Sequence, residues 1–204
     1  MIAATASGVG RIVVQSYTNW PNIREGGPVK TEDDPLDPHP PAEQAHSLAA
    51  IRHLEDAVLA APLEGIALRY GSFYGPGASE PVVEILRQRK FPIVGAGTGL
   101  WSWLHIDDAA AATVAAIERG PRGIYNIVDD EPAPVSEWLP YLAEQVGAKP
   151  PRHVPLWLGR LLAGEVGVSM MTQIRGASNA KAKRELGWEP RYPSWRQGFR
   201  EALG

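Results

Sequence analysis

Three runs of apolar, partly β-branched residues along the chain have the pattern of buried strands. They lie at residues 11–16, 65–70 and 123–128, and each is bounded by glycine, proline or polar residues. The second run breaks into a loop at residues 71–77 that holds three glycines and one proline. Ligands of open α/β sheets bind where strands end at their carboxyl edge, so this loop is a candidate ligand site.

Residues 42–61 have the apolar spacing of an amphipathic helix that ends before Pro62. Four apolar side chains recur three or four positions apart: Leu48, Ile51, Leu54 and Val58. A strand, a loop, a helix and a second strand form a crossover unit, which implies a parallel sheet. Residues 21–41 contain six prolines among acidic and polar residues and predict a long irregular loop.

The second half of the chain predicts further helices and two short strands. We expect the strands at residues 92–94 and 103–106, and helices at residues 80–90, 178–186 and 194–203. An alanine-rich helix capped by Asp107 or Asp108 is expected to stop at Gly120, and another, capped by Ser136, runs to Gly147.

Composition narrows the classes of function. The 204 residues are 44% hydrophobic with a net charge of -3, which favours a packed globular domain and argues against nucleic-acid or anionic-membrane binding. The chain has no cysteine, which excludes disulfides and thiolate metal sites. No segment approaches the roughly 20 apolar residues of a membrane span. We expect a soluble, cytoplasmic protein that binds neither membrane nor nucleic acid.

Four stretches, taken together and in this order, resemble the extended short-chain dehydrogenase/reductase superfamily, the NAD-dependent epimerase/dehydratase group. They are Arg69-Tyr-Gly-Ser-Phe-Tyr-Gly-Pro-Gly77, Leu104-His-Ile-Asp-Asp-Ala109, Gly123-Ile-Tyr-Asn-Ile-Val128 and Lys181-Ala-Lys-Arg-Glu-Leu-Gly-Trp-Glu-Pro190. The resemblance implies one α/β domain over residues 1–204, with a partial Rossmann-like parallel sheet flanked by helices. It also implies a small, mainly helical C-terminal substrate lobe, built from residues 75–105 and 129–204.

The same resemblance implies a dinucleotide-binding half with a Gly-x-x-Gly-x-x-Gly turn between a strand and a helix. The sequence contains no such turn, and Gly8-Val-Gly10 precedes a strand instead of following one. We therefore expect the chain to be the C-terminal portion of a family member. The cofactor that the family implies is NAD or NADP, and its binding by this chain is doubtful.

In the family, a helical Tyr acts as general acid/base, a Lys four residues later lowers its pKa, and a strand-end Ser or Thr orients the substrate hydroxyl. Ser16 and Thr18 are the candidates for the strand-end position. In the helix, one register places Ser47 and Ile51 at the Tyr and Lys positions, and the other places Leu48 and Arg52 there. Neither register supplies the Tyr/Lys pair.

The resemblance assigns further site residues. The residues that match the segment lining the nicotinamide are Arg69, Tyr70, Gly71, Ser72 and Phe73. The candidate substrate-binding residues are Tyr74, Trp101 and His105, and Trp101 falls where family members acting on nucleotide sugars often have an Arg. His105 with Asp107 and Asp108 is more simply read as helix capping than as a metal site, so we expect no metal.

The implied activity is NAD(P)-dependent epimerase-, dehydratase- or reductase-type oxidoreduction of a small hydroxyl or carbonyl substrate, and the isolated chain is expected to be atypical or inactive. One alternative is a redox-silent relative that senses a dinucleotide or binds a regulatory partner. Another is a chain that functions only as a homo-oligomer covering its exposed sheet edge.

Overall fold

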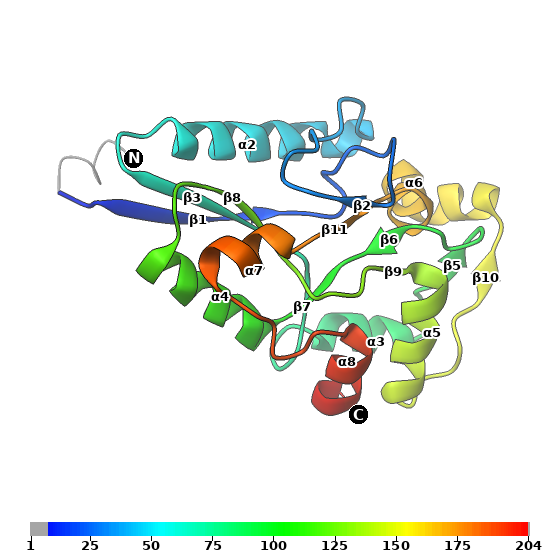
Figure 1. Cartoon of the computed structure of the whole chain (residues 1–204). Helices are drawn as coiled ribbons and strands as arrows, with labels where there is room; N and C mark the ends of the chain where they lie inside the picture. Colours follow the sequence, from blue (N-terminus) through cyan, green and yellow to red (C-terminus); the bar gives the residue numbers. More distant parts are fainter. Residues whose placement is uncertain (1–7, 204) are drawn as a thin grey trace.

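A computed structural model describes residues 8–203 and contains a three-stranded parallel sheet as its centre (Figure 1). The sheet has the order β1 (Arg11–Tyr17), β3 (Glu64–Tyr70) and β8 (Gly123–Ile127). In its register Ser16 lies beside Arg69, and Arg69 lies beside Asn126. The three predicted strands are confirmed, and their carboxyl ends meet at one edge.

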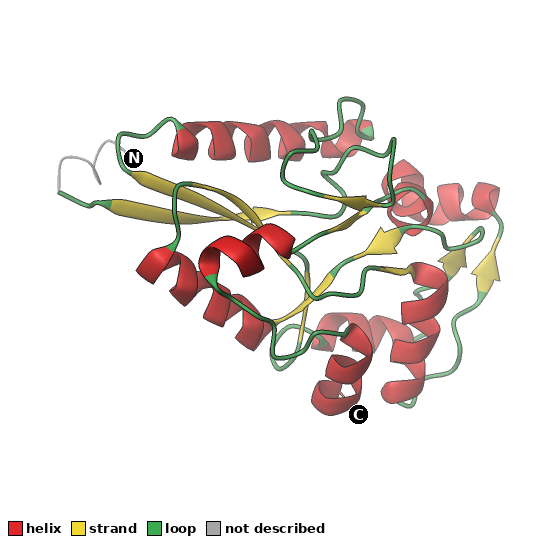
Figure 2. Cartoon of the chain, in the orientation of Figure 1, coloured by secondary structure: helices red, strands yellow, loops and turns green. Residues whose placement is uncertain are grey.

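Helices cover both faces of this sheet (Figure 2). Helix α2 (Ala42–Leu59) packs on β1 and β3 from one side. Helix α4 (Ile106–Arg119) packs on the other side, together with α7 (Ala180–Leu186), which contacts β8. Since parallel strands are stable only when both faces are buried, the apolar runs and the amphipathic helix fit this layered, Rossmann-like arrangement.

One edge of the sheet is open in the described part of the chain. Among residues 8–203, no strand pairs with the other side of β1. Three β1 side chains that a covering layer would bury are only partly buried: Ile12, Val13 and Val14. The homo-oligomer that the sequence suggests for this edge stays a prediction.

The proline-rich segment at residues 21–41 is mostly irregular, as predicted, but it contains a short strand that the sequence did not indicate. Strand β2 (Val29–Lys30) pairs in parallel with β11 (Gly176–Ala177). An isolated bridge between Asn22 and Leu36 closes the loop on itself. The segment is therefore fixed to the C-terminal part of the chain.

The rest of the chain forms a lobe of short strand pairs and helices beside the sheet (Figure 1). The strand pairs are β4 (Ser72–Tyr74) with β7 (Trp103–His105), β5 (Ile93–Val94) with β10 (His153–Val154), and β6 (Leu100–Trp101) with β9 (Ala133–Pro134). The helices are α3 (Glu80–Arg87), α5 (Val135–Gln145), α6 (Leu156–Thr172) and α8 (Trp195–Leu203). Its role in binding substrate stays a prediction.

The lobe has its own aromatic core. Trp103 packs edge-on against Trp138 at a centroid distance of 4.8 Å and against Phe199 at 5.1 Å. Tyr74 packs on the same Phe199 ring, also at 5.1 Å. These rings are almost completely buried. Several of the scattered tryptophans of the sequence thus form one cluster that joins β4, β7, α5 and α8.

Two predicted helix caps are wrong. Helix α4 is capped by His105, whose side chain accepts a hydrogen bond from the Asp107 N–H, and both Asp107 and Asp108 lie inside the helix. Helix α5 begins after Pro134, so Ser136 lies in its first turn. In both cases the helix starts earlier than the first polar residue suggested, because the preceding residue already has the extended conformation of a cap.

Helix α6 was not predicted at all. Its sequence is apolar on all sides, and Gly164, with φ 66°, bends it into two segments, so the helical period is hidden. Among the helices of residues 8–203, none combines the length and apolar character needed to cross a bilayer.

We predict that Gly198→Ala destabilises the fold. A Cβ atom at this position of α8 would lie 1.9 Å from the Tyr74 hydroxyl oxygen, inside the aromatic core. Overpacking of this kind costs about 1–3 kcal/mol of unfolding free energy.

Urea unfolding measures the effect, with Gly10→Ala as the control, because nothing lies within 4 Å of a Cβ there. Equal stability of Gly198→Ala and the unmodified chain would contradict the packing of α8 on Tyr74.

Candidate functional site

Two hydroxyl groups meet at the carboxyl edge of the sheet. The Tyr17 hydroxyl, at the end of β1, lies 3.2 Å from the Ser72 Oγ, just after β3. The Asn19 side-chain amide donates to the same Ser72 Oγ at 3.3 Å. Tyr17, Asn19, Ser72 and Ser102 are called the strand-end cluster below.

Asn19 fixes the geometry of this cluster. It has φ 74°, a left-handed conformation that Asn tolerates better than most residues. Its Oδ1 accepts from the Ser102 N–H at 2.9 Å, and its Nδ2 donates to the Ser102 carbonyl at 3.1 Å. The Ser72 N–H donates to that carbonyl at 2.9 Å. Ser72 is therefore held at both its backbone and its side chain.

A buried ion pair lies directly beside the cluster. Arg69 of β3 donates twice to Glu55 of α2, at 2.7 and 2.6 Å, and Ser16 of β1 donates to the same carboxylate at 2.6 Å. All three residues are buried. The predicted catalytic Ser16 and the predicted cofactor-binding Arg69 are thus both bonded to Glu55 (Figure 1 shows the three elements that they join).

Thr18, the second candidate for the strand-end role, is fully buried. Its Oγ1 accepts from the Asn22 Nδ2 at 3.0 Å. Asn22 reaches on to the backbone of β11. The Thr18 hydroxyl therefore anchors the residue 21–41 loop.

Helix α2 presents an apolar wall to the end of β1. A groove of about 550 Å³, called the β1–α2 groove, is lined by Gln15, Ser16, Tyr17, Ala50, Ile51 and Leu54. Ser47 is exposed and lies one turn before Ile51 on the same helix. In the alternative register Leu48 is buried in the core, and Arg52 donates to the carbonyls of Leu36 and Asp37.

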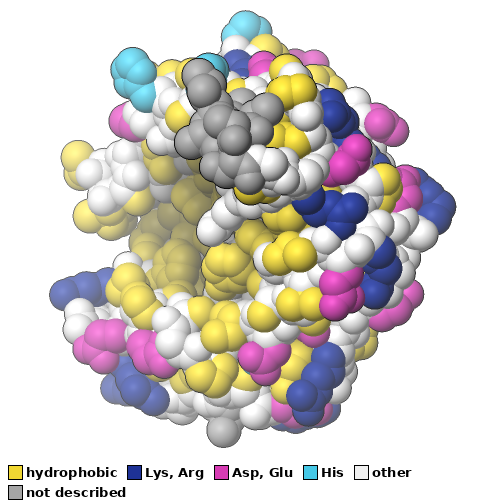
Figure 3. Space-filling model, turned by 90° about the vertical axis from the view of Figure 1, so that its left-hand side faces the viewer, with side chains coloured by type: hydrophobic (Ala, Val, Ile, Leu, Met, Phe, Trp, Pro, Cys, Tyr) yellow, Lys and Arg dark blue, Asp and Glu magenta, His cyan; other side chains and the backbone are white. Residues whose placement is uncertain are grey.

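The face seen from the amino end of the sheet is deeply hollowed (Figure 3). The hollow opens between the upper part of the molecule, where α2 lies, and the lobe helices below, and hydrophobic side chains line it (Figures 1 and 3). This view is from the end of the sheet opposite to the strand-end cluster.

The remaining residues assigned to the nicotinamide are differently placed. The Tyr70 hydroxyl bonds to the Thr113 Oγ1 at 2.5 Å, and a Cβ at Gly71 would lie 2.7 Å from the Ser102 carbonyl oxygen. Phe73 is 37% exposed and packs on the Tyr70 ring. Phe73 is therefore the exposed member of this set, and Ser72, which is 8% exposed, lies beside the partly exposed Tyr17 through the contact of their hydroxyls.

The three residues assigned to substrate lie in the lobe. Tyr74 and His105 are buried, with ring centroids 5.2 Å apart, and burial raises the pKa of Tyr74 well above its usual range. His105 accepts at Nδ1 from Asp107 N–H as the cap of α4. Trp101 is partly buried, and its indole N–H donates to the Met170 carbonyl at 3.0 Å.

Two further carboxyl groups have perturbed protonation. Burial raises the pKa of Glu32. The carboxylate also accepts a hydrogen bond of 2.7 Å from the Asn126 N–H near the end of β8, which opposes the rise. Burial also raises the pKa of Asp129, which is 1% exposed and follows the same strand. Both carboxyl groups lie beside the carboxyl end of β8.

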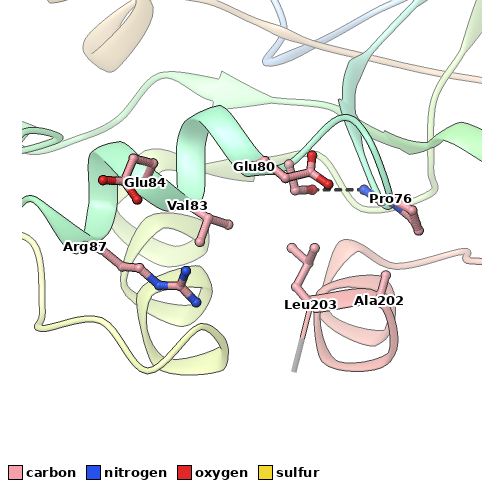
Figure 4. Close-up of a pocket in the computed structure, with 9 residues that line it drawn as sticks. Pro76, Glu80, Val83, Glu84, Arg87, Ala202 and Leu203 are labelled. Atoms are coloured by element: carbon pink, nitrogen blue, oxygen red, sulfur yellow. Dashed lines mark hydrogen bonds between the residues drawn. The ribbon is translucent and has the colours of Figure 1, made fainter.

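Within residues 8–203, no group of three or more His, Asp or Glu side chains is placed to hold a metal ion. A separate pocket lies between α3 and α8 (Figure 4). Gly75 and Ser79 line this pocket, and the Gly75 N–H donates to the Ser79 Oγ at 2.9 Å. Glu80, Glu84 and Arg87 also line the pocket. It shares no residue with the strand-end cluster.

The structure therefore brings Ser16 and Ser72 to one edge and adds three residues that the sequence did not single out: Tyr17, Asn19 and Ser102. A signal for Tyr17 was present, since it is the hydroxyl side chain immediately after Ser16 at a strand end. Asn19 and Ser102 gave no such signal, because their contact joins residues 83 positions apart.

Comparison with known families identifies the class of protein to which this chain belongs. The family model described as NAD dependent epimerase/dehydratase family matches residues 3–128, which includes β1, α2, β3 and β8. The chain belongs to this family, whose cofactor is NAD(P).

Two curated relatives are reductases. The chain is 41% identical over 203 residues to a 3-diazoavenalumate denitrifying reductase of Streptomyces sp, covering 97% of this chain and 66% of the relative. It is 33% identical over 160 residues to a 2-alkyl-3-oxoalkanoate reductase of Stenotrophomonas maltophilia (strain K279a), covering 72% of this chain and 48% of the relative. The chain thus spans about half to two thirds of the length of these relatives.

Solved structures agree on the fold. DesIV, a dTDP-glucose 4,6-dehydratase from Streptomyces venezuelae solved with NAD and TYD bound, superposes with a TM-score of 0.74 at 23% identity. The match covers 99% of this chain and 61% of that one. The predicted partial Rossmann-like fold is confirmed.

We predict that Arg69→Met strongly destabilises the chain. The substitution leaves the Glu55 carboxylate buried with only Ser16 as a side-chain partner, and breaking such a pair costs about 3–5 kcal/mol. Arg160→Met is the control, because the Arg160–Glu165 pair is more than half exposed and its loss costs about 0.5 kcal/mol or less. Unfolding of the two variants in urea measures the difference, and similar stabilities would contradict the role of the buried pair.

Proposed function

We propose that this chain forms the nicotinamide and substrate end of an NAD(P)-dependent oxidoreductase site that acts on a small carbonyl or hydroxyl compound. The observation that carries the proposal is the Tyr17 hydroxyl, 3.2 Å from the Ser72 Oγ at the carboxyl edge of a parallel sheet. Membership of the epimerase/dehydratase family supports a dinucleotide as the cofactor.

The residues at this edge fit the nicotinamide part of that cofactor. The β1–α2 groove offers the apolar side chains of Ile51 and Leu54 opposite Tyr17, which suits a planar ring. Gly8 and Gly10 precede β1 and therefore lie at the opposite edge of the sheet from Ser72. The described residues thus contribute to the part of a dinucleotide site that binds the nicotinamide and not to the part that binds the pyrophosphate. When bound, the cofactor supplies or accepts a hydride.

Tyr17 is the proton donor in this proposal. A carbonyl oxygen placed within hydrogen-bond distance of the Tyr17 and Ser72 hydroxyls takes the Tyr17 proton as its carbon takes a hydride, which gives the alcohol. Tyr17 is partly exposed, so solvent can restore its proton. Asn19 positions Ser72 from behind. Neither Ser47 nor Ile51 of α2 has a group able to replace a helical Tyr/Lys pair.

We extend the reductive direction from the two curated relatives, which are both named as reductases. A nucleoside-diphosphate sugar fits less well as a substrate. By the family resemblance, Trp101 falls where members acting on nucleotide sugars often have an Arg, and an indole cannot neutralise phosphates.

The second candidate is a redox-silent relative that senses a dinucleotide or binds a regulatory partner. One observation supports it: Ile51, which one of the two registers of the family resemblance aligns with the Lys, lines the groove with an apolar side chain. Binding of reduced nicotinamide dinucleotide with no turnover of any ketone or aldehyde would select this candidate.

We predict that Tyr17→Phe lowers the turnover number for carbonyl reduction by about 10²–10⁴-fold, the usual contribution of a positioned proton donor. NADH and NADPH oxidation at millimolar cofactor with a panel of ketones and aldehydes measures it. Tyr70→Phe is the matched control, because the Tyr70 hydroxyl bonds to Thr113 and lies outside the cluster.

A Tyr17→Phe chain that turns over at the rate of the unmodified chain would overturn the role of Tyr17. If Tyr70→Phe loses as much activity as Tyr17→Phe, the loss reflects packing of the sheet edge instead of proton transfer.

A further inference from the structure

The lobe contains a partly open apolar cavity on the side of Trp101 that faces α6. It has a volume of about 210 Å³, and we call it the lobe cavity. Its walls include Phe91, Trp101, Met170 and Met171, with Ala163 on the bent helix α6 and Lys90 at the side. An engineered cavity of roughly 150 Å³ is large enough to bind benzene, so this space admits one aromatic ring.

The walls offer a ligand apolar contacts and almost no hydrogen bonds. The Trp101 indole N–H already donates to the Met170 carbonyl, and the other wall side chains are hydrocarbon or thioether, apart from Lys90. A nucleobase buried here would leave its polar edge without partners, at a considerable cost in free energy. Aromatic and thioether walls favour a carbocyclic aromatic ring.

Three cations gather beside the cavity. A neighbouring groove of about 470 Å³ shares Lys90 and Ala163 with the lobe cavity and is also lined by Arg89 and Arg152. Within the described chain, none of these three cations forms an ion pair with an acidic residue. In a chain with a net charge of -3, these three side chains form a local group of positive charge, which attracts anionic ligands.

We propose that the lobe cavity binds the aromatic ring of a small aryl carboxylate whose carboxylate lies against Arg89, Lys90 and Arg152. This inference rests on the proposed function, because it names an aryl carboxylate as the class of substrate for that activity. The cavity is close in sequence to the proposed reaction site, because Trp101 precedes Ser102 of the strand-end cluster.

The methionines allow a direct test that needs no cofactor. Two of the three methionines of the chain, Met170 and Met171, line the cavity. In the chain labelled with ¹³C at its methionine methyl groups, 3-phenylpropanoate should shift both signals through the ring current of its phenyl group. We expect a dissociation constant of about 1 mM, which is usual for a ligand of this size. Met170→Leu and Met171→Leu assign the signals.

The neutral analogue 3-phenyl-1-propanol should bind about three- to fivefold more weakly, since it lacks the charge that the exposed cations attract. Arg152→Gln should weaken the binding of 3-phenylpropanoate to a similar degree and leave the binding of the alcohol unchanged. Ala163→Leu should fill the cavity and weaken the binding of both ligands by about tenfold or more. Leu161→Ala is the control on the same helix, because Leu161 is 76% exposed and lines neither space.

Equal affinity for the acid and the alcohol would overturn the role of the cations. Stronger shifts with UDP than with 3-phenylpropanoate would show that the cavity is a nucleotide site, and no shift at roughly 10 mM acid would show that it binds no aryl ligand. Because none of these readings involves hydride transfer, they separate a failure of this inference from a failure of the proposed activity.

Discussion

The buried contact between Arg69 and Glu55 determines the shape of the proposed site. It joins α2 to the centre of the sheet by two hydrogen bonds of 2.7 and 2.6 Å, and Ser16 of β1 adds a third bond to the same carboxylate. A buried ion pair is stable only when its geometry is good and its remaining lone pairs are used, and both conditions hold here. The contact therefore fixes how α2 lies over the ends of β1 and β3.

That position of α2 has a chemical consequence. The helix presents Ala50, Ile51 and Leu54 to the groove beside Tyr17, so the helix gives the site an apolar wall instead of an acid/base pair. The polar chemistry is on the strand ends, where Asn19 clamps Ser72 close to the Tyr17 hydroxyl. On the lobe side, Trp101, the neighbour of Ser102 in the sequence, lines the lobe cavity, and Arg89, Lys90 and Arg152 line the groove next to it. The proposed carbonyl substrate rests on the strand-end cluster, and the proposed aryl carboxylate ligand rests on the lobe cavity.

Strand and helix patterns were sufficient to predict the sheet and its covering helices, because residues 11–16 and 65–70 are apolar runs and Leu48 and Val58 repeat at helical spacing. Helix α6 could not be predicted, because its apolar sequence has no distinct polar face and Gly164 interrupts the helix. Ser16 and Ser72 were candidates from the sequence, and the structure places both at the carboxyl edge, while their roles stay predictions. The engagement of Ser16 and Arg69 with Glu55 could not be predicted, because this contact depends on the register of β1 and β3 and on the rotation of α2.

In the proposed site, the nicotinamide end of the cofactor binds at the carboxyl edge beside Tyr17 and Ser72. Calorimetric titration of the chain with reduced nicotinamide mononucleotide and with NADPH tests it most directly, with Ser72→Leu as the variant that fills the edge. We expect the two compounds to bind with similar affinities, within about threefold, and Ser72→Leu to abolish the binding of both. NADPH binding that is a hundredfold tighter than that of the mononucleotide, or unaffected by Ser72→Leu, would contradict it.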